Sequence, residues 1–207
     1  MYNFFLGLDL GQAQDYTALA VVERKEFRYE AKPCEYHIRH LERPKLGTPY
    51  PAIVDRVKQL MASSSLQNKT ALVVDATGVG APVVDMFRKA GLAPVAITIT
   101  GGNTVSREAS GYHVPKRDLV TTLQVLFQSG RLKVAGSLPE ARTLVNELLN
   151  FKVKINVKTA HDSYEAWREG IHDDLVLAVA LACWYGEQQP PALDPELVRA
   201  IARARLY

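Results

Sequence analysis

Short apolar runs, each closed by turn-forming residues, predict strands in the first half of the chain. The segments "NFFLGLDL" (3–10) and "YTALAVVE" (16–23) flank the turn-rich "GQAQD", which predicts an antiparallel hairpin. A third strand is expected at 34–42. The apolar, β-branched run "TALVVDATG" (70–78) predicts a strand buried on both faces, and "APVAITIT" (93–100) predicts a fifth strand.

Apolar residues at helical spacing predict the elements between and after these strands. One helix opens at Pro51, and a second, "GAPVVDMFRKAG", closes at Gly91 as its C-cap. Two amphipathic helices are expected at 116–130 and 138–151. The segment "HDDLVLAVALACWYGE" (172–187) predicts a deeply buried helix, because eleven uncharged residues follow its acidic start.

The remaining segments carry weaker signals. The Gly-rich stretch 101–114 has no periodicity and is expected to be a loop, whereas "FKVKINV" (151–157) alternates like a short strand. The division into domains follows: 1–188 as one folded domain, and 189–207 as a tail with a proline break and a short basic helix.

Three strands in a row, followed by alternating helices and strands, predict an α/β fold with a mixed sheet. The expected order of its five strands is 3-2-1-4-5, with helices flanking the sheet. This is the element order of the ribonuclease H-like fold. In it, strands one and four are parallel neighbours, so their carboxyl ends meet at one edge.

Acidic residues stand where three of these elements meet that edge. Asp9 and Asp75 end the two neighbouring strands, and Asp173 and Asp174 begin the last helix. Taken singly, each acid has an ordinary structural explanation, since aspartate favours turns and helix N-caps. These explanations leave the convergence of the acids on one edge unexplained.

A cluster of carboxylates without cysteine and with little histidine is a hard oxygen site, which suits Mg²⁺ or Mn²⁺ rather than zinc. Two such ions sharing Asp9 could flank a scissile phosphate, one activating the attacking water and the other stabilising the leaving oxygen. His172 is a possible auxiliary group at this edge, although a lone histidine at a helix start is more often structural.

Composition and charge add modest constraints. The 207 residues carry a net charge of +3, but the stretch 100–160 holds nine basic and four acidic side chains, a local net charge of +5. This stretch is either a solvated helix face or a flank that binds a polyanion. Two distant cysteines, no signal peptide and no membrane-length apolar segment indicate a cytoplasmic protein without membrane contact.

Four segments, in order, resemble the nuclease domain of tailed-phage terminase large subunits: "FLGLDLGQAQDYTALAVV", "ALVVDATGVGAPVVDMF", "VPKRDLVTTLQVLFQSGRLKV" and "HDDLVLAVALA". The resemblance covers roughly residues 3–187. It implies a two-metal endonuclease that cuts double-stranded viral DNA during genome packaging in the host cytoplasm. Asp9, Asp75, Asp173 and Asp174 match the family's acids, with Asp173 the preferred direct ligand of the last pair.

The same resemblance implies partners: an ATPase motor domain, a small terminase and a portal. It also places Arg107, Lys116 and Arg117 near the DNA backbone, where they would position a duplex without reading its sequence. The sequence contains no G-x-x-x-x-G-K-[ST] loop, so this chain is not expected to translocate DNA by itself.

Three alternatives stay open. A RuvC-type Holliday-junction resolvase would use the same scaffold and a similar acidic set. An actin-like or sugar-kinase-like ATPase lobe would also begin with "DLG", although such proteins need two lobes. In a catalytically inactive DNA-binding or scaffold domain, the acids would be only caps and turns.

Overall fold

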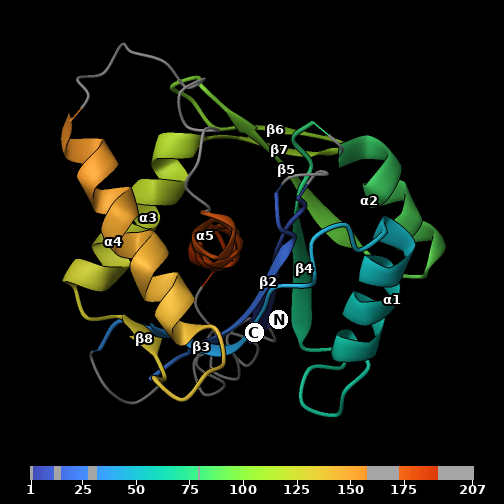
Figure 1. The fold of residues 1–207 in the computed structure, drawn as a ribbon, viewed down its shortest axis with the longest axis horizontal. Coiled ribbons are helices and arrows are strands. Elements are labelled where there is room, and N and C mark those ends of the chain that lie inside the picture. The colour runs from blue at the N-terminus through green and yellow to red at the C-terminus, as the bar shows by residue number, and fades with distance from the viewer. Residues whose placement is uncertain (1, 12–14, 28–31, 79, 158–172, 191–207) are drawn as a thin grey trace, which may run out of the picture.

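A mixed sheet forms the centre of the protein in a computed structural model that describes residues 2–11, 15–27, 32–78, 80–157 and 173–190 (Figure 1). Its eight strands in the described part are β1 (Phe4–Asp9), β2 (Ala18–Lys25), β3 (Glu35–Glu42), β4 (Thr70–Asp75), β5 (Pro94–Thr100), β6 (Ser106–Glu108), β7 (Gly111–Pro115) and β8 (Leu132–Val134). They lie in the order β6-β7-β5-β4-β1-β2-β3-β8. The predicted order 3-2-1-4-5 is confirmed within this larger sheet.

Strand directions also agree with the prediction. β1 pairs with β2, and β2 with β3, in antiparallel fashion. β1 pairs with β4, and β4 with β5, in parallel fashion. The α/β ribonuclease H-like class is therefore confirmed, and the parallel half of the sheet has a single carboxyl edge at which ligands can bind.

Helices cover both faces of the sheet. α1 (Tyr50–Met61) and α2 (Gly80–Lys89) lie on one face, and α3 (Lys116–Gln128), α4 (Ala141–Val157) and α5 (Asp174–Glu187) on the other. Figure 1 shows α5 end-on, between the sheet and the pair α3 and α4. Two apolar clusters fill these layers: Leu6, Leu8 and Phe87 belong to the first, and Phe5 and Leu119 to the second.

The packing of α5 on β1 is unusually close. Nearly every residue of α5 is buried, and its backbone passes directly over Gly7 of β1. A Cβ atom at Gly7 would collide with the backbone carbonyl of Ala178. A glycine without a side chain is thus what allows the helix to approach the strand.

Polar contacts hold the carboxyl-terminal end of α5 against the sheet, at the strand ends opposite the carboxyl edge of β1 and β4. Glu187 accepts hydrogen bonds from the Tyr36 hydroxyl at 2.7 Å and from Arg131 at 2.7 and 3.1 Å. The buried Arg24 of β2 donates to the backbone carbonyls of Gln189 and Pro190 at 3.2 and 3.3 Å. The helix is therefore tied to β2, β3 and the start of β8.

Three segments differ from the prediction. The stretch 101–114, expected to be a loop, contains the antiparallel pair β6 and β7, and β7 adds to the sheet beside β5. Val114 of β7 is buried and anchors this pair. The sequence of the pair has no alternating pattern that would have predicted its strands. The stretch 151–157 is the end of α4 rather than a strand, because no Gly or Pro separates it from the helix before it. β8 was not predicted and pairs with β3.

Some expectations lie outside the described residues: the basic helix of the tail, within 191–207, and the position of His172. The boundary between a domain at 1–188 and its tail stays a prediction. Among the helices of the described residues, none has the length and apolar character needed to cross a bilayer.

Replacing Gly7 by alanine is expected to lower the free energy of unfolding by about 1–3 kcal/mol, because α5 must move away from β1. For a chain of this size, each kcal/mol corresponds to a fall in Tm of about 2–4 °C. The matched control is Gly136→Ala, at a position where an added Cβ meets nothing within 4 Å. Equal melting temperatures for the two variants, measured by calorimetry, would contradict the close packing.

Candidate active site

Two carboxylates leave the sheet side by side at its carboxyl edge. Asp9 is the last residue of β1 and Asp75 the last residue of β4. The parallel register pairs Leu8 with Val74, the residues immediately before the two acids. The structure thus brings together two side chains that are 66 positions apart in the sequence, as the strand-end pattern predicted.

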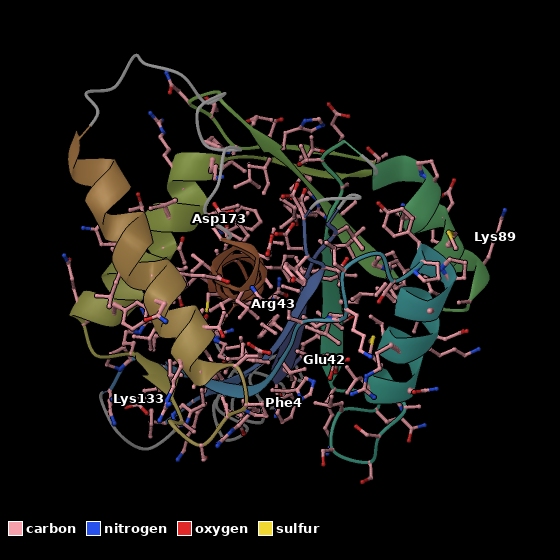
Figure 2. All side chains as sticks on the ribbon, viewed as in Figure 1. Phe4, Glu42, Arg43, Lys89, Lys133 and Asp173 are labelled. Carbon is pink, nitrogen blue, oxygen red and sulfur yellow. The ribbon has the colours of Figure 1, made fainter. Side chains whose placement is uncertain are left out.

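α5 brings two further carboxylates to the same edge. Asp173 is the N-cap of the helix, and Asp174 its first residue. The Asp174 side chain is buried, whereas that of Asp173 is 22% exposed. Figure 2 labels Asp173 beside the end-on view of α5. Because the helix body is apolar and packs on β1, its polar end has to lie at the edge of the sheet.

The acids at this edge perturb one another. Burial raises the pKa of Asp9 well above its ordinary value, and the negative charges of Asp75, Asp174 and Asp173 raise it further. The positive charge of Lys116 lowers it in part. Asp9 therefore holds its proton to a higher pH than an ordinary aspartate does.

The pKa of Asp75 is also raised, although the partners of its carboxylate offset part of the rise. Burial raises its pKa, while hydrogen bonds from Thr77 and the charge of Lys116 lower it. The Thr77 backbone N–H donates to Asp75 Oδ1 at 2.7 Å, and the Ile99 N–H donates to the Thr77 hydroxyl at 2.8 Å. Asp75 thus closes a turn with one carboxylate oxygen, which fixes the side chain at the end of β4.

A lysine lies among the acids. The ammonium of Lys116, the first residue of α3, is 3.4 Å from Asp173 Oδ2, and its side chain is 17% exposed. The sequence prediction placed Lys116 near the DNA backbone. The structure shows it paired with Asp173, where its positive charge offsets part of the acidic charge.

Sequence reasoning missed a fifth carboxylate. Glu147 of α4 is buried, and its Oε2 accepts a hydrogen bond at 3.1 Å from the Val176 N–H in the first turn of α5. Burial raises its pKa to about 7, with further increases from Asp174 and Asp173 and decreases from the Val176 N–H and Arg43. The signal in the sequence was slight: a single acid on an amphipathic helix.

The other predicted cations lie on the outside. Arg107 stacks over the Tyr112 ring at 5.3 Å, within the hairpin of β6 and β7. Arg117, 53% exposed, donates to the Asn103 carbonyl at 2.7 Å and lies 3.4 Å from Asp118. Both are exposed and belong to the segments that adjoin Lys116 in the chain. Their contact with DNA stays a prediction.

The donor set fits a hard divalent cation. It consists of carboxylate oxygens whose mutual repulsion a positive ion would relieve, and Mg²⁺ and Mn²⁺ prefer such ligands. Within the described ranges, however, no three His, Cys, Asp or Glu side chains converge tightly enough to surround an ion. The charges are assembled at one edge, but the side chains do not form a closed coordination shell.

Comparison with known proteins identifies the family. The profile of the terminase RNaseH-like domain matches residues 6–184, from within β1 to the last turn of α5. The chain belongs to this family. The four aspartates lie within the matched range. No significant match was found among curated proteins.

Solved structures resemble this terminase RNaseH-like domain in fold. The large terminase nuclease of the thermophilic phage G20c shares 20% identity with a TM-score of 0.56, over 86% of this chain and 80% of that one. The Mn-soaked terminase nuclease domain of human cytomegalovirus shares 15% identity with a TM-score of 0.51, over the same shares of the two chains. RuvC of Thermus thermophilus, at 14% identity and a TM-score of 0.40 over 88% of this chain and 92% of RuvC, is too distant to support a function.

The buried acids predict a distinctive dependence of stability on pH. A raised pKa means that the folded state holds a proton that the unfolded state releases. The contribution of Glu147 is therefore fully present below about pH 4.5 and is lost as the pH rises through about 7. The groups that face Glu147 are Asp173 and Asp174 on α5 and Arg43 after β3.

In metal-free buffer, the Tm is thus expected to fall between pH 5 and pH 8. The Glu147 contribution to this loss is on the order of 3 kcal/mol, from a pKa shift from 4.5 to about 7. Glu147→Gln is expected to flatten the profile, which calorimetry at half-unit pH intervals would reveal. An unchanged profile in that variant would refute the assignment.

Proposed function

We propose that this domain is a metal-dependent endonuclease that hydrolyses double-stranded DNA, as the genome-packaging nuclease of a viral terminase large subunit. The observation that carries the proposal is the meeting of Asp9, Asp75, Asp173 and Asp174 at the carboxyl edge of the sheet. A stable fold does not require such an accumulation of like charge, whereas a site for divalent cations and a phosphodiester does.

Family membership supports the proposal, as do the neighbours described as terminase nucleases, one of them soaked with Mn. Asp9, Asp75, Asp173 and Asp174 would hold Mg²⁺ or Mn²⁺, in our proposal two ions. When bound, such ions would supply Lewis-acid activation of the scissile phosphate and of water.

The residues of the chain have separate tasks in this proposal. Asp75, fixed by the Thr77 turn, would orient one ligand oxygen. Asp9, which lies among the other acids, would be shared between the two ions. Lys116 limits the net negative charge at the edge, so that a DNA phosphate can approach. Arg107 and Arg117 would contact the backbone on the outer side and fix the position of the duplex.

In its biological context, the domain would work with an ATPase motor domain, a small terminase and a portal in the host cytoplasm. These partners follow from the family alone. The basic side chains of this domain are expected to provide weak DNA binding without sequence preference, and the motor would supply the substrate.

Asp9→Asn and Asp75→Asn are expected to slow nicking of a supercoiled plasmid in Mn²⁺ or Mg²⁺ by more than about 100-fold, since even outer-sphere partners of metal ligands cost 10–100-fold. The matched control is Asp85→Asn, an exposed aspartate of α2 paired with Arg88. EDTA should abolish cleavage by the parent protein.

Cleavage at the parent rate by either strand-end variant would refute the assignment of the site. Preferential cutting of four-way junctions over linear duplex would instead support the resolvase alternative. ATP binding without DNA cleavage would support the ATPase alternative.

Removing the outer cations should weaken DNA binding without altering the chemical step. The double variant Arg107→Ala and Arg117→Ala is expected to reduce the slope of log K against log salt by about two, one unit for each lost phosphate contact. Lys89→Ala, on the far side of the sheet in Figure 2, serves as the control. An unchanged slope, measured by fluorescence anisotropy, would mean that these arginines do not contact the backbone.

A further inference from the structure

The start of α5 is capped in an unusual way. In most helices, an aspartate at the N-cap accepts a hydrogen bond from the backbone N–H of the second or third helical residue. Asp173 occupies the N-cap, but its side chain makes no such bond. The third residue, Val176, donates its N–H to Glu147 Oε2 of α4 instead, at 3.1 Å.

The Asp173 carboxylate is engaged elsewhere. Its Oδ2 lies 3.4 Å from Lys116 Nζ, and its charge contributes to the raised pKa of Asp9. The side chain of aspartate is short, so the cap and the acidic cluster compete for it. Glu147 of α4 accepts the hydrogen bond from the first turn of α5 that an N-cap side chain would otherwise accept. The Asp173 carboxylate therefore faces the acidic cluster.

Glu147 is itself held in place. Its Oε1 lies 3.7 Å from a terminal nitrogen of Arg43, and the Arg43 guanidinium stacks over the Tyr16 ring at 4.3 Å. Tyr16 precedes β2 and Arg43 follows β3, so the contacts connect both strands through α4 to α5. In Figure 2, Arg43 is labelled close to the end-on view of α5.

We propose that Glu147 is a positioning residue that caps α5 in place of Asp173 and thereby keeps the Asp173 carboxylate available to the acidic cluster. This exchange of the capping role between Asp173 and Glu147 belongs to the fold itself and needs no metal. Its consequence for metal binding and cleavage rests on the function proposed above. Arg43 supports the exchange by orienting Glu147.

The test is a double-mutant cycle between Glu147 and Asp173, read as Tm in metal-free, DNA-free buffer. Glu147→Met removes the hydrogen-bond acceptor while nearly preserving volume, and Glu147→Gln keeps an acceptor. In the parent, Asp173→Ala should change the Tm little, because Asp173 caps nothing and the loss of its contact with Lys116 is offset by weaker repulsion of Asp9. In the Glu147→Met background, Asp173 is expected to turn back onto its own helix, so Asp173→Ala should lower the Tm by about 2–4 °C.

In the Glu147→Gln background, Asp173→Ala should behave as it does in the parent. Leu144→Ala, which weakens a fully buried packing position of the same helix, is the control for general damage to α4. It should leave the effect of Asp173→Ala unchanged. Should Glu147→Met fail to fold, Glu147→Asp takes its place in the cycle, because the side chain shorter by one methylene moves the acceptor away from the Val176 N–H. An effect of Asp173→Ala that is equal in the parent and in the acceptor-free background would overturn the proposal.

A second measurement separates positioning from simple structural support. Titration calorimetry with Mn²⁺ should show at least about tenfold weaker binding for Glu147→Met, and near-parent binding for Glu147→Gln. In plasmid nicking, kcat should fall for Glu147→Met while KM for DNA stays unchanged. If Glu147→Met binds Mn²⁺ like the parent, Glu147 does not position Asp173. If the parent binds no Mn²⁺, the proposed function fails, and the Tm cycle alone decides the capping exchange.

Discussion

Like charges held together at a partly buried edge raise one another's free energy, and this repulsion is the constraint on which the arrangement of the domain depends. Asp9, Asp75 and Asp174 are all buried. They stay together because the elements that carry them are fixed independently of their charges. The register of β1 and β4 places two of them, and the apolar body of α5 places the others.

The basic groups that lie near these acids in the described residues are also placed by elements of the fold. Lys116 stands at the start of α3 beside Asp173, and Arg43 approaches Glu147 from the end of β3. Each basic group comes from an element that borders the acidic edge without being part of it. The protein therefore offsets the repulsion between the acids only in part.

Much of this arrangement could be predicted from the sequence, because its signals are local. Acids that end buried strands, and acids that begin a long apolar helix, are visible as patterns, so Asp9, Asp75, Asp173 and Asp174 could be found. Glu147 could not, because an acid on an amphipathic helix ordinarily faces solvent, and only the packing of α4 on α5 turns it inward. The pair β6 and β7 was missed because its partners are set by tertiary contacts rather than by alternation.

The attachment of the opposite end of α5 has a consequence for the place at which the described chain ends. The helix has 14 residues, so its carboxyl-terminal end lies about 20 Å from the acidic edge. Arg24, Tyr36 and Arg131 fasten that end to the rear of the sheet. The described part of the chain therefore ends, at Pro190, on the side of the domain away from the carboxylates.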